Sequence, residues 1–107
     1  MVNFYASWCG PCMREMPALE EAWKTLEKQG VTLIGLTDDD SKNIERVREH
    51  FGISFPLYEL DKDLLGIGIY EIPRTLGISS KGEILFQHEG DKDWANPEFL
   101  EEYASKW

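Results

Sequence analysis

The chain has two cysteines among its 107 residues, and both lie in the segment Trp8-Cys9-Gly10-Pro11-Cys12-Met13. Two thiols separated by two residues can close into a disulfide, and on a helix the second falls about one turn after the first. Small domains held together by structural disulfides normally use four or more cysteines at wider separations. We therefore interpret the pair as reactive or metal-binding, and dithiol-disulfide chemistry is the favoured interpretation.

The position of the pair predicts different roles for its two sulfurs. An apolar segment precedes Cys9 and a helical pattern follows it, so Cys9 faces the free N–H groups and the positive dipole end of a helix, which stabilise a thiolate. We expect Cys9 to be the attacking sulfur. Cys12 lies one turn inside, in register with the apolar stripe, and is expected to be the buried, less acidic, resolving sulfur. Pro11 suits the first helical turn, where a missing N–H removes no helical hydrogen bond.

Metal binding is the alternative chemistry for two thiols. A zinc site generally needs four ligands from Cys and His, and the two histidines, His50 and His88, lack metal-ligand spacing. A metal-handling protein that binds a soft ion such as Cu(I) through the two thiolates stays as the alternative function, with Met13 or Met16 as a weak further ligand. We expect no cofactor and no resident metal.

Length and composition predict a single domain over residues 1–107. The chain is 42% hydrophobic, which is enough for one core, and it contains no repeat, linker or low-complexity stretch. Its formal net charge of −9 argues against nucleic acid or membrane-surface partners. No apolar run approaches a membrane span and no leader is recognisable at Met1, so we expect a cytosolic protein or one whose leader is not present in this chain.

Hydrophobic periodicity predicts the elements that position the cysteines, and Gly30 and Gly52 are expected to end the first two helices. The predicted elements are a strand at 1–6, a helix from about 10 to 29, a strand at 31–36, a helix capped by residues 38–41, a strand near 55–58, a hairpin of 74–79 and 83–88, and a helix beginning at 96–98 with Phe99, Leu100, Tyr103 and Trp107 on one face.

This order predicts an α/β fold. A parallel βαβ unit is joined by an antiparallel hairpin in one mixed central sheet, flanked by helices that we expect on both faces. Open α/β sheets place their sites at the carboxyl ends of strands, which is where Cys9 lies.

The segment Phe4–Pro17 resembles the active-site segment of thioredoxin-fold proteins, most closely that of the TlpA/ResA-like thiol-disulfide oxidoreductases. The likeness continues through residues 30–35, 55–56, 71–75 and 81–84 and so covers most of the chain. It implies a thioredoxin-like fold in which the N-terminal hairpin of the family is absent from this chain. Gly77 departs from the family, in which a bulky strand residue is usual, and the segment between the prolines at 56 and 73 is short.

The resemblance implies roles for three further positions. Asn3 stands where thioredoxins proper have a buried aspartate, as in the TlpA/ResA-like group. Glu15 by spacing alone is most simply a solvated helical charge one turn from Cys12; the resemblance implies instead that it lies beneath the disulfide and exchanges a proton with Cys12. Ile72-Pro73 matches the cis-proline element that faces the disulfide, whose neighbouring backbone groups can pair with an extended substrate segment.

Trp8 could shield the disulfide, although a tryptophan beside a strand end is as often plain packing. The residues expected to bind the substrate are Trp8, Gly10, Pro11, Ile72 and Pro73. Trp23 and Trp107 are assigned to the core, and Trp94 receives no role. The acidic run 38–40 is interpreted as a capping loop rather than a calcium site, because it lacks EF-hand spacing.

The leading hypothesis is a thiol-disulfide oxidoreductase that acts on a cysteine-containing protein substrate and is served by an upstream thiol-disulfide donor protein. The Gly-Pro spacer resembles that of reducing thioredoxins, so reduction is favoured, while potential and compartment set the direction. A peroxidase is less favoured, because thioredoxin-like peroxidases place a proline and a hydroxyl residue before one cysteine and no proline precedes Cys9. The resemblance implies an extracytoplasmic bacterial setting, periplasm or cell envelope, with the cytoplasm as the alternative, and we expect a monomer.

Overall fold

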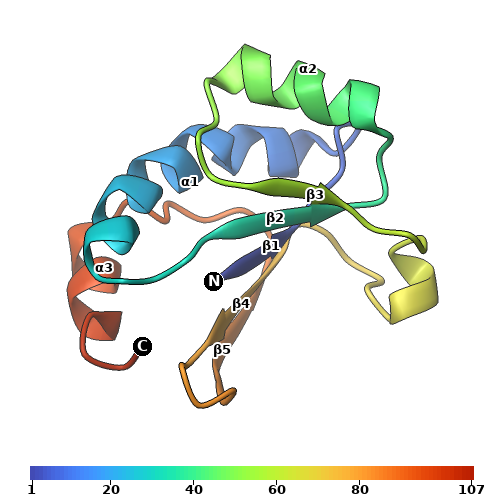
Figure 1. Cartoon of the computed structure of the whole chain (residues 1–107). Helices are drawn as coiled ribbons and strands as arrows, with labels where there is room; N and C mark the ends of the chain where they lie inside the picture. Colours follow the sequence, from blue (N-terminus) through green and yellow to red (C-terminus); the bar gives the residue numbers. More distant parts are fainter.

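The chain starts in the middle of its sheet. β1 (Val2–Phe4) pairs in parallel with β2 (Ile34–Thr37) on one side and antiparallel with β4 (Arg74–Ile78) on the other. β3 (Leu57–Glu59) and β5 (Ile84–Glu89) form the two edges. The computed structural model describes all residues 1–107, and its strand order is β3-β2-β1-β4-β5 (Figure 1). The mixed sheet predicted from the sequence is therefore confirmed.

Capping residues set the bounds of the helices, which are α1 (Gly10–Lys28), α2 (Ser41–Phe51) and α3 (Pro97–Tyr103). The Asp40 side chain accepts a hydrogen bond from the Asn43 N–H at the start of α2, and Gly52 ends that helix in the left-handed conformation, which glycine adopts without steric cost. At the start of α3 the Asn96 side chain accepts a hydrogen bond from the Glu98 N–H. Trp107 lies beyond the end of α3 and not on its face, because the helix ends at Tyr103.

The three α-helices lie on one side of the sheet (Figure 1), whereas the sequence led us to expect helices on both sides. The opposite side carries half-buried apolar residues, namely Val2, Ile34, Leu36 and Leu76. The stretch left to supply a helix there, residues 60–70, forms only a short 3-10 helix, η1 (Leu65–Ile67). It contains Gly66 and Gly68, and each glycine costs a helix about 1 kcal/mol relative to alanine.

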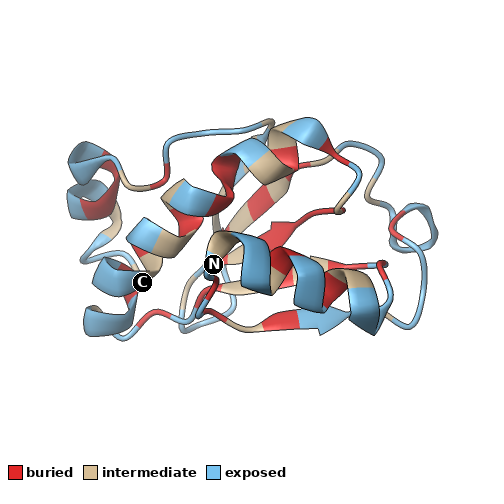
Figure 2. Cartoon of the chain, turned by 90° about the horizontal axis from the view of Figure 1, so that it is seen from above, coloured by how far each residue is buried: buried red, intermediate tan, exposed pale blue.

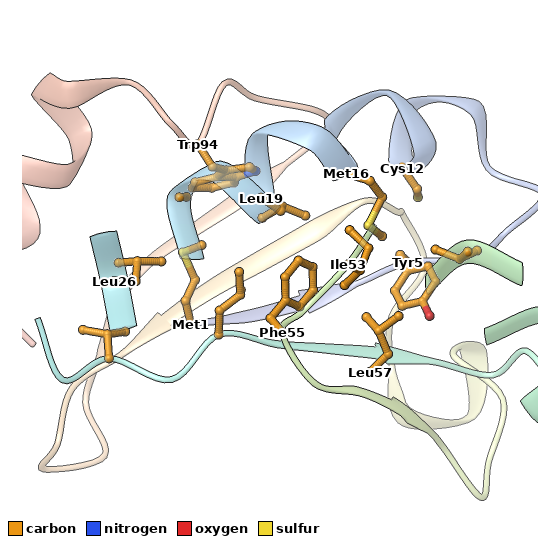
Figure 3. Close-up of a cluster of buried hydrophobic side chains, with 14 of the residues drawn as sticks. Met1, Tyr5, Cys12, Met16, Leu19, Leu26, Ile53, Phe55, Leu57 and Trp94 are labelled. Atoms are coloured by element: carbon orange, nitrogen blue, oxygen red, sulfur yellow. The ribbon is translucent and has the colours of Figure 1, made fainter. Parts of the chain in front are cut away.

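The core fills the space between the sheet and the helices (Figure 3), and the outward faces of the helices are exposed (Figure 2). Two strand glycines belong to this packing. A side chain at Gly35 would collide with Leu57, and one at Gly77 would collide with the ring of Phe86, which occupies the space that a bulky strand residue would need. None of the helices combines the length and the apolarity needed to cross a membrane.

Candidate active site

Cys9 and Cys12 form a disulfide at the start of α1, with their Cα atoms 5.2 Å apart. Cys9 is the N-cap of the helix, and its sulfur accepts a hydrogen bond from the backbone N–H of Cys12 at 3.2 Å. Cys9 is 6% exposed and Cys12 is fully buried. The sulfur that was expected to attack is thus the one that a partner can reach, and the sulfur expected to resolve lies beneath it.

The first turn of α1 favours a thiolate at Cys9. No acidic side chain lies in that turn, so no negative charge offsets the positive end of the helix dipole. A thiolate at Cys9 would also keep the N–H of Cys12 as a donor, because a charged acceptor strengthens such a bond. Among the residues expected at the docking surface, Gly10 is exposed and Pro11 is half-buried in this turn.

The Ile72–Pro73 element faces the disulfide from the start of β4. The peptide bond between these residues is cis. The carbonyl oxygen of Ile72 lies 3.8 Å from the sulfur of Cys9. Pro73 is buried, and its carbonyl oxygen accepts a hydrogen bond from the N–H of Gly90 at 2.8 Å. Ile72, which lies before β4, makes no hydrogen bond to another backbone group. The backbone of Ile72 is therefore free to pair with another chain beside Cys9.

An apolar groove continues from Ile72 along the segment that contains η1. Trp8, Leu65 and Tyr70 are 76%, 63% and 75% exposed, values unusual for such large apolar side chains. The groove has a volume of about 320 Å³ and is lined by Trp8, Asp38, Asp63, Leu64, Leu65, Ile69, Tyr70 and Ile72. Sequence reasoning missed the contribution of residues 63–70. Their one signal was a run of apolar residues without the spacing of a buried helix or strand.

Glu15 lies three residues after Cys12 on α1, about one helical turn away, and it is only 2% exposed. Its Oε1 accepts a hydrogen bond from Asn3 Nδ2 at 2.7 Å. Its Oε2 accepts one from Trp94 Nε1 at 2.9 Å and one from the backbone N–H of Lys92 at 3.3 Å. The interpretation of Glu15 as a solvated charge is therefore wrong, and its carboxyl group is buried among these three donors.

Opposing effects act on the proton affinity of Glu15. Burial raises the pKa of its carboxyl group, because the charged form loses its hydration, and this effect outweighs the three hydrogen bonds that favour the carboxylate. The negative charge of Asp91 adds to the rise. Arg14, its exposed neighbour in the sequence, pairs with Asp91 across 3.5 Å and does not contact Glu15. A buried carboxyl group with a raised pKa holds its proton to higher pH than an exposed one does.

Trp94, which was assigned no role from the sequence, is fully buried and packs among Phe86, His88 and Phe99. It lies in the loop between β5 and α3, over α1 (Figure 3), and its indole N–H donates to Glu15, 79 residues away in the chain. The sequence carried no sign of the contact between Trp94 and Glu15, because that contact depends on how the loop folds back over α1. Trp23 and Trp107 pack against the core as predicted.

The acidic run between β2 and α2 ties three segments together. Asp38 accepts from the N–H of Leu64 at 2.9 Å, and Asp39, which is buried, accepts from the N–H of Ser7 at 2.8 Å. Asp40 caps α2, as the sequence predicted for the run as a whole. No three His, Cys, Asp or Glu side chains in the chain are placed to hold a metal ion.

Comparisons with known proteins agree with this geometry. A model of the AhpC/TSA family matches residues 1–90. The chain is 35% identical over 86 residues to the thiol-disulfide oxidoreductase ResA of Geobacillus thermodenitrificans, covering 78% of this chain and 49% of the relative. It is 36% identical over 93 residues to ResA of Halalkalibacterium halodurans, covering 83% and 52%. The chain thus spans about half the length of the curated relatives it matches.

Solved structures show the same fold. A thiol:disulfide interchange protein of the thioredoxin family from Chlorobium tepidum superimposes with a TM-score of 0.81 at 26% identity, covering 96% of this chain and 77% of the other. The thioredoxin-like fold predicted from the sequence is confirmed.

Proposed function

The chain belongs to the AhpC/TSA family, and from its site we propose that it is a protein thiol-disulfide oxidoreductase in which Cys9 and Cys12 cycle between dithiol and disulfide. The observation that carries this proposal is the asymmetry of the pair. Cys9 caps α1 and keeps 6% of its surface exposed, and Cys12 lies one turn further on with no exposed area. One sulfur can meet a partner, and the other can be reached only from Cys9.

In the reducing direction, which we favour from the Gly-Pro spacer, the Cys9 thiolate attacks one sulfur of a substrate disulfide. A bond forms between Cys9 and that sulfur, the substrate disulfide breaks, and the departing thiolate takes a proton. The Cys12 thiolate then attacks the Cys9 sulfur and releases the second substrate thiolate. Two electrons pass to the substrate, and the Cys9–Cys12 disulfide remains for an upstream dithiol donor protein to reduce.

Glu15 supplies the proton balance of the second step. As a carboxylate it accepts the proton of the Cys12 thiol, and as an acid it returns a proton when the disulfide is reduced again. Burial that raises its pKa supports this role, since it makes the carboxylate a stronger base than an exposed glutamate.

The substrate is proposed to dock across Ile72 and Trp8. The free backbone groups of Ile72 lie beside Cys9, where an extended segment could add its own main-chain hydrogen bonds. The exposed Gly10 and the half-buried Pro11 follow Cys9 in the first turn of α1, and the buried Pro73 follows Ile72. The exposed ring of Trp8 and the groove beyond it offer apolar contact to the residues that flank the substrate cysteine.

We place this chemistry outside the bacterial cytoplasm, in a monomer, on the strength of the resemblance to the TlpA/ResA-like group. The direction of electron flow depends on the reduction potential of the pair. A potential close to that of thioredoxin, measured against glutathione, supports a reductant, and a much higher potential supports an oxidant.

Substitution of the resolving sulfur tests the roles directly. The variant Cys12→Ser should accumulate a mixed disulfide between Cys9 and a protein disulfide substrate, which mass spectrometry detects after acid quenching. The matched variant Cys9→Ser should accumulate none, because Cys12 has no exposed surface. Trapping through Cys12 in place of Cys9, or failure of Cys12→Ser to trap any disulfide protein, would contradict the proposal.

A further inference from the structure

The two oxygens of the Glu15 carboxyl group have different partners. Oε2 faces two donors, the indole N–H of Trp94 and the backbone N–H of Lys92. Oε1 faces one, the side-chain amide of Asn3. An indole N–H and a backbone N–H can only donate hydrogen bonds, whereas a side-chain amide carries both a donor and an acceptor. The carboxyl group therefore has one oxygen with fixed donors and one oxygen with an adaptable partner.

This difference decides where a proton can be held. A proton on Oε2 would point at two N–H groups, and at least one hydrogen bond would be lost in a buried site. A proton on Oε1 meets only the Asn3 amide. In the present arrangement Asn3 Nδ2 also donates to Thr75 Oγ1 at 3.0 Å, and Asn3 Oδ1 is buried without a hydrogen-bond partner. If the amide turns over, Oδ1 accepts from the protonated Glu15, and the Thr75 hydroxyl, which can donate as well as accept, satisfies the same oxygen.

We propose that Trp94, together with the backbone of Lys92, is a positioning element that keeps Oε2 of Glu15 as a permanent acceptor, so that the exchanged proton is held on Oε1 against an Asn3 amide that reverses. The hydrogen bond of the Trp94 side chain goes to Glu15 and not to a cysteine, so Trp94 acts through Glu15. The part of this inference that concerns the rate of resolution rests on the proposed function; the placement of the proton does not.

Several charged and titratable groups surround this cluster. Asp91 is the nearest carboxylate, and Arg14 pairs with it at the surface. The Lys92 Nζ lies 5.2 Å from the centre of the Trp94 ring, and the imidazole of His88 stands edge-on to that ring at 5.5 Å. In the reduced protein the Cys12 thiol is a further titrating group on α1. Because the His88 imidazole contacts the Trp94 ring, it needs its own control.

Nuclear magnetic resonance of the unaltered disulfide form tests the placement without any variant at Trp94. The Trp94 indole N–H, the Lys92 amide N–H and the Asn3 side-chain amide should shift with one common midpoint as pH changes, and the Trp23 indole should not. In Glu15→Gln this common titration should vanish, and in His88→Gln it should persist. A Trp94 signal that does not move with the Glu15 midpoint, or that titrates unchanged in Glu15→Gln, would overturn the proposal.

Trp94→Phe removes the N–H and keeps an aromatic ring, and Trp23→Phe is the matched control on α1. The reduced protein reacts with an aromatic disulfide such as 5,5'-dithiobis(2-nitrobenzoate) in two absorbance phases, of which the second is the attack of Cys12 on Cys9. The pH midpoint of that phase should rise by about one pH unit in Trp94→Phe, equivalent to about 1.4 kcal/mol of lost preference for the carboxylate. It should not move in Trp23→Phe.

The two measurements separate the inference from the proposed function. If Glu15→Gln leaves the second phase and its pH dependence unchanged, the proton role of Glu15 fails, while the resonance titration still decides where the proton is held. If Glu15→Gln removes the pH dependence but Trp94→Phe leaves the midpoint in place, the proposed function stands and the positioning role of Trp94 is wrong. In a background of Glu15→Gln, Trp94→Phe should cause no further shift.

Discussion

The disulfide separates two regions that differ in almost every physical respect. Further into the protein, about one helical turn after Cys12, Glu15 is buried and accepts a hydrogen bond from the buried Trp94, which links α1 to the loop before α3; we call this pair the region beneath the disulfide. Beside it, Trp8 and Tyr70 are more than two-thirds exposed and line an open groove. The first region consists of hydrogen-bonded polar groups buried in an apolar core, and the second consists of apolar side chains exposed to water.

The contrast indicates that the two regions have different roles. A buried carboxyl group costs stability unless its partners are complete, so the region beneath the disulfide must be kept as one unit. Large exposed apolar side chains add little to the stability of the free protein, but they gain when a partner covers them. We therefore expect substitutions beneath the disulfide to affect folding and the rate of resolution, and substitutions beside it to affect recognition.

The same substitution at one tryptophan of each region gives the largest expected difference. Trp94→Ala empties a fully buried site and removes a partner of Glu15, so it should lower the free energy of unfolding by about 3–5 kcal/mol. Trp8→Ala should change it by no more than about 0.5 kcal/mol, because that ring is mostly in water. Urea unfolding of the oxidised proteins measures both values. Similar losses at the two positions would remove the distinction between the regions.

Loss of the buried carboxyl group should produce the next largest effect. Glu15→Gln keeps the shape of the side chain but cannot accept a proton from Cys12, and it should slow the resolving step by about 100-fold or more. Glu27→Gln, an exposed glutamate on the same helix, is the matched control and should have no effect. Single-turnover kinetics with a mixed disulfide on Cys9 isolates this step. Equal rates for the two variants would contradict a proton role for Glu15.

The sequence predicted the parts of this contrast that depend on local pattern. The CxxC spacing and the apolar stripe of α1 placed the pair at a helix N-terminus, and the structure bears this out. The capping residues in the sequence likewise located the starts of α2 and α3. Contacts between distant segments were out of reach. Trp94 meets Glu15 only because the loop after β5 folds over α1, and periodicity within a window of a few turns carries no trace of such a contact.

The predicted starts of two strands differ from the observed ones, because hydrophobicity indicates both strands and buried core residues. Residues 31–33 and 55–56 are apolar and were predicted as strand, but β2 begins at Ile34 and β3 at Leu57. Leu33 and Phe55 are fully buried without pairing in the sheet, so their hydrophobicity reflects the core rather than a strand. The groove beside the disulfide was missed for a related reason, since exposed apolar residues look like core residues in a sequence.

Truncations in the groove should have a smaller effect, confined to large substrates. Tyr70→Ala and Trp8→Ala should each lower kcat/KM for a protein disulfide by about tenfold, about 1.4 kcal/mol of lost contact. Reaction with a small disulfide, which cannot reach the groove, should be unchanged. Tyr58→Ala is the control, because Tyr58 is exposed on β3 outside the groove. If the small and the protein substrate lose equally, these residues act on the sulfurs and not on recognition.

The pH dependence of stability gives the smallest expected effect and the one whose sign is fixed by physical chemistry. Burial raises the pKa of Glu15 in the folded protein above its value of 4.5 in the unfolded chain. Below that unfolded value the carboxyl group is protonated in both states, so its ionisation makes no contribution to the free energy of unfolding. As pH rises through the folded pKa, the unfolded chain has already released its proton, so the folded state loses stability until both forms are ionised.

Glu15→Gln removes this titration, so the free energy of unfolding of the wild type minus that of the variant should fall as pH rises from the unfolded pKa of 4.5 through the raised pKa of the folded protein. The oxidised proteins are compared, since the disulfide prevents Cys12 from titrating in the folded or the unfolded state. Glu27→Gln should give a difference with no such fall, because Glu27 is exposed. A difference for Glu15→Gln that rises with pH would mean that the hydrogen bonds from Trp94 and Asn3 outweigh burial, and that the carboxylate is the favoured form beneath the disulfide.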